Sequence, residues 1–132
     1  KCTMFTDTEV VAYLVDLLVR RHGLPAELAV TALAPPFWDE IDAMEGDRHL
    51  LHHALRLTYA SAMMNGPFAI AVADQDSMVA FTDRSKLRPL VGAEAGDRLY
   101  VSSEEAAIRA MEPALDRVFM PRAGEPIVGR CR

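Results

Sequence analysis

Lysine, cysteine and long hydrophobic runs are all scarce in this sequence, and each shortage excludes a class of protein. Lysine occurs only at positions 1 and 86, and acidic residues outnumber lysine and arginine by 19 to 14. The net charge of −5 disfavours nucleic acid as the main partner, since phosphate binding needs a basic surface. No apolar run approaches the roughly 20 residues of a membrane span, and no charged leader precedes an apolar run. We therefore expect a cytoplasmic protein that binds neither nucleic acid nor membrane.

The two cysteines, Cys2 and Cys131, lie near opposite ends of the sequence. They can form a disulfide only if the two ends meet within bonding distance. Because disulfides are rare in proteins without a secretory signal, we expect no disulfide here.

Apolar residues are abundant: they make up 51% of the 132 residues, which excludes a disordered tail. A chain of this length is one domain or part of one, and buries about 65–70% of its unfolded surface. Residues 6–64 have mostly helical patterns, whereas residues 66–128 have mostly strand patterns. The sequence therefore predicts an α+β fold.

The first of four predicted helices follows a capping box formed by Thr6 and Glu9, and it ends before Gly23. Two short helices come next, and the fourth runs from Arg48 to about Met64. The predicted buried face of this fourth helix consists of residues at helical spacing, namely Leu50, Leu51, Ala54, Leu57, Tyr59 and Ala62.

The second part is organised around residues 66–90. Residues 68–73 are apolar and predict a strand that is buried on both faces. Residues 78–82 predict the returning strand of a hairpin, with Asp74 and Asp76 in its turn. The remaining predicted elements are a turn at 92–96, strands at 98–101, 118–120 and 126–128, and a helix at 105–111.

Four segments in a fixed order resemble a known family. They are Thr6-Asp-Thr-Glu9, Asp83-Arg-Ser-Lys-Leu-Arg-Pro-Leu90, Val101-Ser-Ser-Glu104 and Arg122-Ala-Gly-Glu-Pro-Ile-Val128. Together they resemble the class II glutamine amidotransferases, and most of all their glutamate synthase-like branch. The resemblance implies the C-terminal portion of that family's domain, which is an αββα sandwich of the N-terminal-nucleophile hydrolase type.

The resemblance also implies an activity. Domains of this family hydrolyse glutamine to glutamate through a thioester on an N-terminal cysteine, and the ammonia passes to a synthase partner. Cys2 follows Lys1, so it lacks the free α-amine that serves the family's nucleophile as base. The family's carboxylate-binding arginine and Asn-Gly oxyanion element are not found between Cys2 and Asp7. We therefore expect this chain alone to be an inactive part of a glutaminase that needs the N-terminal half of the domain.

Two further expectations concern association and alternative roles. If part of the sandwich is missing, the apolar faces of the hairpin that should meet the missing strands are left uncovered, and the chain should self-associate or bind a complementary chain. A second interpretation is a non-catalytic binding or regulatory module that docks on a synthase subunit. A third, independent of the family, is a small α+β domain that binds a ligand in the loop from Asp83 to Arg88.

Asp7 is the main candidate for a substrate-binding residue. Thr6 and Glu9 satisfy the helix cap, so the carboxylate of Asp7 is not needed there. The resemblance assigns this aspartate to the α-ammonium of the substrate glutamine. The structural alternative is an acidic residue in the first turn that only favours the helix.

Asp83, Arg84, Arg88 and Glu104 form a second charged group, which we interpret as scaffold. An arginine paired with a carboxylate can lock such a loop through two parallel hydrogen bonds. Relatives often carry glycine where this sequence has Lys86. Because a left-handed backbone costs lysine about 1–2 kcal/mol, we expect a different type of turn here.

The histidines at positions 49, 52 and 53 raise the question of a metal site. His49 and His53 are four residues apart on a predicted helix, a spacing found in zinc sites. No cysteine or acidic residue in register completes the ligand set, so we interpret all three histidines as a solvated helix face. Trp38 is interpreted as a packing residue. We expect neither a metal nor a cofactor.

Overall fold

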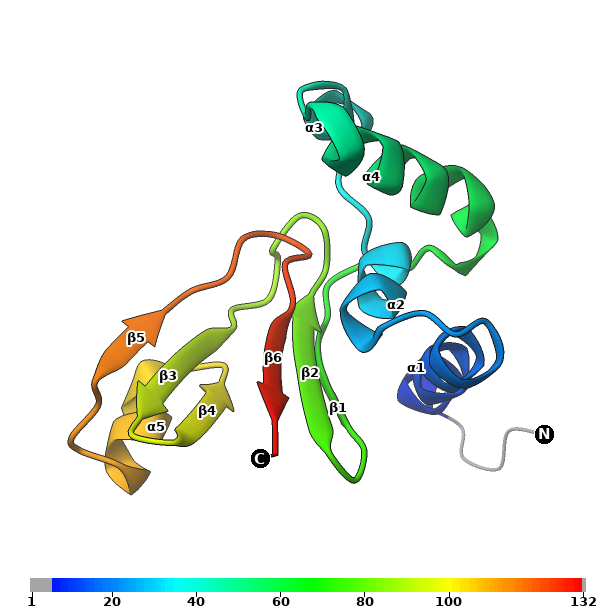
Figure 1. Ribbon diagram of the computed structural model, residues 1–132. Helices are drawn as coiled ribbons and strands as arrows, with labels where there is room; N and C mark the ends of the chain where they lie inside the picture. Colours follow the sequence, from blue (N-terminus) through cyan, green and yellow to red (C-terminus); the bar gives the residue numbers. More distant parts are fainter. Residues whose placement is uncertain (1–5, 132) are drawn as a thin grey trace.

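The computed structural model describes residues 6–131 (Figure 1). Its helices are α1 (Asp7–Asp16), α2 (Ala26–Leu33), α3 (Trp38–Asp42), α4 (Gly46–Thr58) and α5 (Glu105–Met111). Its strands are β1 (Ala69–Ala73), β2 (Ser77–Thr82), β3 (Val91–Ala95), β4 (Arg98–Ser102), β5 (Arg117–Phe119) and β6 (Ile127–Arg130). A π-helical turn, Leu17–Arg21, extends α1, and a 3₁₀ turn, Ala60–Ala62, follows α4. Helices and strands are thus largely segregated along the chain, and the predicted α+β class is confirmed.

The strands form two three-stranded antiparallel sheets, with orders β1-β2-β6 and β4-β3-β5. In the first sheet Ile70 of β1 pairs with Phe81, and Ile127 of β6 pairs with Ala80 on the other side of β2. In the second sheet Gly92 lies between Val101 and Phe119. The long connection from β5 returns the chain to the first sheet, so β6 lies beside β2 (Figure 1).

Three clusters of buried side chains show that the molecule has four layers. The first sheet packs on α1, α2 and α4 through Val79 and Phe81, which face the helices. Between the sheets, Ala80 and Ile127 meet Leu99 of β4. On the outer face of the second sheet, residues of β3 pack against Ile108 of α5. The order helices, sheet, sheet, helix is an αββα arrangement, and it follows from the two-residue alternation of side chains along β2 and β3.

Helix α4 exposes the residues that the sequence predicts to be buried. Leu50, Leu51 and Leu57 are 65%, 42% and 61% exposed, respectively, so that prediction is wrong for them. Figure 1 shows α3 and α4 projecting beyond α2, and no element of the described chain covers this side of α4. We call the surface formed by Leu50, Leu51 and Leu57 the outer leucine face of α4.

The inward stripe of α4 carries polar residues. Leu55 is buried in the main core, and Tyr59, just after the helix, packs against the same core. Arg48 and His52 lie on the same stripe, because positions 48, 52, 55 and 59 follow the helical repeat. Hydrophobic periodicity therefore indicates the wrong side for the three leucines, whereas Tyr59 and Ala62 pack against the core as predicted.

Strands β1 and β3 also differ from the prediction. In β1 only Ile70 and Val72 are half-buried, and the three alanines of the strand are exposed, so burial on both faces is wrong. The reason is that β1 pairs with β2 alone among the described strands and lies at the sheet edge. Residues 92–95 are strand rather than turn, because pairing on both sides of β3 outweighs the low strand propensity of glycine and alanine.

The β1–β2 hairpin turn is formed as predicted. Asp74 accepts hydrogen bonds through Oδ1 from the backbone N–H of Asp76 at 2.9 Å and of Ser77 at 2.7 Å.

Within residues 6–131, no helix combines the length and apolarity needed to cross a membrane.

Candidate functional site

Asp7 begins α1 and keeps one carboxylate oxygen free of hydrogen bonds within the described part of the chain. Its Oδ1 accepts from the backbone N–H of Thr8 at 2.9 Å. The cap itself is made by Thr6, whose Oγ1 accepts from the N–H of Glu9 at 3.4 Å. The sequence argument that Asp7 is not required as the N-cap is therefore supported by the geometry. Asp7 is exposed, as a residue that meets a small substrate must be.

A cavity of about 310 Å³ lies beside Asp7, and we call it the Asp7 cavity. One wall is the start of α1, with Asp7, Thr8 and Val11. The other wall is the segment from Met64 to Ile70, which leads into β1. The Met64 N–H donates to the carbonyl of Leu33 at 2.8 Å and so fixes the start of this wall against α2.

The sequence did not reveal that Asn65 and Gly66 line the same cavity as Asp7. It indicated them only as the end of a helix, which is their local role. Gly66 has a φ of 107°, a backbone conformation that strongly favours glycine. The placement of Asn65 across the cavity from Asp7 depends on how α1 packs against the first sheet, and no local signal reports that packing.

Asp83 organises the loop that follows β2. It is 3% exposed. Its two carboxylate oxygens accept from the backbone N–H groups of Ser85, Leu87, Arg88 and Phe68 at 3.0 to 3.4 Å. Burial raises the pKa of Asp83, but these N–H donors together outweigh burial, so the pKa lies below its ordinary value. Ionised Asp83 therefore stabilises the folded state. This contribution is complete above the ordinary aspartate pKa of about 3.9, and it is lost as the pH falls through the lowered pKa of the folded state.

The scaffold interpretation fits Asp83, but the predicted arginine–carboxylate lock is wrong. Arg84 donates through Nη2 to Oδ1 of Asn65 at 2.8 Å, and its guanidinium lies 4.8 Å from the ring centroid of Phe37. Arg88 is exposed, and Glu104 is the N-cap of α5. The backbone N–H groups already occupy both oxygens of Asp83, which leaves Arg84 to connect this loop to the wall of the Asp7 cavity.

Lys86 adopts the turn type that the sequence argument ruled out. Its φ is 52°, in the left-handed region, so the expectation of a different turn is wrong. Two contacts hold it there: its N–H donates to the Asp83 carbonyl at 3.0 Å, and Nζ donates to the Pro121 carbonyl at 2.7 Å. Tertiary contacts therefore outweigh a local backbone preference.

The three histidines differ in environment. His49 and His53 have ring centroids 5.6 Å apart, and His53 also makes an edge contact with Trp38. Trp38 is 41% exposed, so it packs at the surface of α4. His52 is not part of a solvated face, because its Nδ1 is buried without a hydrogen-bond partner in the described chain. No group of three or more potential metal ligands is clustered within residues 6–131.

The cysteines contribute nothing to this site within the described chain. Cys131 is an exposed free thiol. Cys2, which the sequence argument considered as a nucleophile and as a disulfide partner, lies outside the described residues.

Comparison with known families agrees with the fold. The family model for class II glutamine amidotransferases matches residues 3–119. The chain therefore belongs to the class II glutamine amidotransferases. It is similar to a protein of Archaeoglobus fulgidus described only as uncharacterized, with 51% identity over 131 residues. That alignment covers 99% of this chain and 35% of the relative, so the chain spans about a third of the relative's length.

Proposed function

We propose that this chain is part of a glutaminase domain in which Asp7 binds the α-ammonium group of glutamine. The observation that supports this most is the placement of Asp7 at the edge of a cavity with one oxygen unengaged within the described chain. A carboxylate is the natural partner of a substrate ammonium, because a hydrogen bond between charged groups is stronger than a neutral one. At about 310 Å³ the cavity has room for a small amino acid.

The nucleophile of the proposed reaction would come from a part of the protein beyond this chain. The free edge of β1 lies next to the Asp7 cavity, since Ala69 and Ile70 belong to both. An unpaired strand edge accepts a further strand through its backbone groups. A strand added there would run beside Asp7, which is where a reacting group must be to meet bound glutamine.

In this proposal each part has one role. Asp7 holds the ammonium of glutamine, and the segment from Met64 to Ile70 forms the opposite wall. The added nucleophile forms a thioester with the side-chain carbonyl of glutamine, ammonia leaves, and water then releases glutamate. The ammonia is used by a glutamate synthase-like partner in the cytoplasm. The chain by itself does not turn over glutamine.

The test is an Asp7→Asn substitution in the longer parent protein, assayed for glutamate release. The change keeps the size of the side chain and removes its charge, so we expect KM for glutamine to rise roughly ten- to a hundredfold. The melting temperature should change little. In the matched control, Thr6→Ala, we expect a loss of about 1 kcal/mol of stability from the missing cap and a smaller effect on KM.

Three outcomes contradict parts of the proposal. An unchanged KM with lower stability in Asp7→Asn makes Asp7 a helix-start residue. Absence of turnover in the intact parent protein favours the non-catalytic module that docks on a synthase. Turnover by the isolated chain that Cys2→Ala abolishes makes Cys2 the nucleophile.

A further inference from the structure

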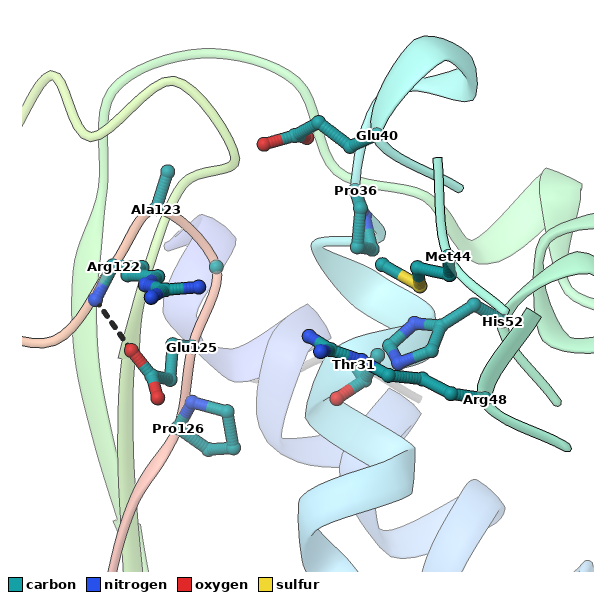
Figure 2. A pocket seen from close by; sticks show the side chains of 11 residues that line it. Thr31, Pro36, Glu40, Met44, Arg48, His52, Arg122, Ala123, Glu125 and Pro126 are labelled. Atoms are coloured by element: carbon teal, nitrogen blue, oxygen red, sulfur yellow. Dashed lines mark hydrogen bonds between the residues drawn. The ribbon is translucent and has the colours of Figure 1, made fainter. Parts of the chain in front are cut away.

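A second cavity, of about 490 Å³, lies between the helices and the loop that precedes β6. We call it the arginine cavity. One side is formed by Pro36, Met44, Arg48 and His52, and the other by the loop from Arg122 to Pro126 (Figure 2). The two cavities have no lining residue in common. The arginine cavity is therefore separate from the site proposed for glutamine.

Two arginines reach into this cavity from opposite sides. In Figure 2 the guanidinium groups of Arg48, from α4, and Arg122, from the loop, point toward one another. Neither guanidinium makes a hydrogen bond or ion pair within residues 6–131, whereas five other arginines are paired with carboxylates. Two such forks across a cavity suit an oxyanion, because guanidinium groups match the geometry of carboxylate and phosphate oxygens.

The two carboxylates at this cavity form no ion pair with either arginine within residues 6–131. Oε2 of Glu125 accepts from the backbone N–H of Arg122 at 2.7 Å, and Oε2 of Glu40 accepts from the N–H of Phe37 at 2.8 Å. Each therefore stabilises its own segment of backbone. Figure 2 shows Glu40 apart from both guanidinium groups, where it is placed to accept from a hydroxyl or amine on the rest of a ligand.

His52 is a further polar residue in the lining of this cavity. Its Nδ1 is buried and has no hydrogen-bond partner in the described chain, which is unusual for a native structure and calls for an explanation. Burial lowers the pKa of His52, and the charge of Arg48 lowers it further, so the ring is neutral at pH 7. His52 lines the cavity but its Nδ1 is closed to solvent, so a ligand there would contact another part of the ring.

The loop wall of the cavity is held in place before any ligand binds. Gly124 has a φ of 66°, and a Cβ at this position would lie 2.6 Å from the carbonyl oxygen of Ala34. The N–H of Glu125 donates to the Arg122 carbonyl at 3.1 Å, complementing the side-chain contact between these residues. A wall fixed in this way reduces the entropy cost of binding.

We propose that the arginine cavity binds a small molecule through a carboxylate or phosphate group held between Arg48 and Arg122. His52 contacts the same ligand, and Glu40 accepts from a donor on its remaining part. This inference does not depend on the glutaminase proposal, because it concerns a cavity without Asp7.

The experiment is calorimetric titration of the full chain with inorganic phosphate and, separately, with citrate, at constant ionic strength set by chloride. We expect saturable one-site binding to at least one probe with a Kd of about 1 mM or lower. A preference for phosphate or for citrate identifies the ligand class. Arg48→Gln and Arg122→Gln should each weaken binding by about tenfold or more. Arg88→Gln is the matched control, an exposed arginine outside the cavity, and should leave Kd unchanged.

Nuclear magnetic resonance of the histidine rings gives a second readout of the same titration. Signals of His52 should move with the same saturation curve, whereas those of His22, which is not part of the cavity lining, should not. The proposal is overturned if neither probe saturates, if Arg88→Gln weakens binding as much as the cavity substitutions, or if His52 does not respond to a probe that binds.

Discussion

Lys86 holds a left-handed backbone conformation that costs an L-residue roughly 1–2 kcal/mol, and it does so in a loop built around Asp83. The ammonium group of Lys86 reaches the carbonyl of Pro121, which connects this loop to the chain segment before β6. At the scale of single residues, a local strain is thus offset by a contact with a distant part of the chain. The two aspartates Asp83 and Asp7 also differ through their surroundings.

Asp83 is buried with both carboxylate oxygens engaged, whereas Asp7 is exposed with one oxygen unengaged in the described chain.

The strain at Lys86 is measurable with two substitutions that remove the same side-chain contact. Both Lys86→Ala and Lys86→Gly lose the ammonium, but only glycine relieves the backbone strain. We expect Lys86→Gly to be more stable than Lys86→Ala by about 1 kcal/mol in denaturant unfolding. At a position with an ordinary backbone conformation, an alanine variant is more stable than a glycine variant. If Lys86→Ala is more stable than Lys86→Gly, the backbone at this position is therefore not strained.

At the scale of elements, the docking of the loop from Arg122 to Pro126 on the end of α2 decides the shape of the arginine cavity. Gly124 permits this contact twice over, through its positive φ and through the absence of a Cβ next to Ala34. Helix α4 forms the facing wall with polar residues, while Leu50, Leu51 and Leu57 point outward. The contact at Gly124 and the polar wall of α4 both depend on how helices and loops pack against one another.

The two contributions of Gly124 can be separated by comparison with Gly96. Gly96 has a φ of 60°, close to that of Gly124, but a Cβ there would have no neighbour within 4 Å. We expect Gly96→Ala to lower the free energy of unfolding by about 1–2 kcal/mol, from backbone strain alone. Gly124→Ala should lower it by a further 1–3 kcal/mol or so, from the clash with Ala34. Equal losses would mean that the loop moves away from α2 without cost.

At the scale of the whole molecule, two of the surfaces that the described layers leave uncovered bear on association. One is the outer leucine face of α4, and the other is the free edge of β1. Scattered apolar residues are normal on a protein surface, but leucines gathered on one helix face favour association. In a longer protein such surfaces are available to the rest of the chain. In this chain alone we expect a second copy to cover the leucine face.

Sedimentation over a range of concentrations tests this expectation. The chain should associate reversibly, and the double substitution Leu50→Glu with Leu57→Glu should weaken association at least about tenfold, since it places charges on the face. Met111→Glu is the control, because Met111 is an isolated exposed residue on α5 and is 78% exposed. A monomer at every concentration would show that the leucine face needs no partner.

Much of the fold could be predicted because its causes are local. The cap at Thr6, the hairpin turn at Asp74, the helix at residues 105–111 and the division into helical and strand parts depend on neighbours a few residues away. Four ordered segments carried the resemblance, and the family that they indicated matches residues 3–119. Asp7 could be selected as a candidate because its first-turn position and its exclusion from the cap are also local.

Only the tertiary structure decided which faces are buried and which residues meet. Leucine spacing indicated the wrong side of α4, because burial depends on what packs against a helix. The apolar run of β1 resembled a central strand, yet β1 lies at an edge. The sequence by itself determined the elements and the class, because hydrogen bonding and backbone preference act over short distances. Packing brought Asn65 to the cavity that Asp7 lines, and Arg48 opposite Arg122. The sequence could not show either arrangement, because the two segments in each pair are distant in the chain.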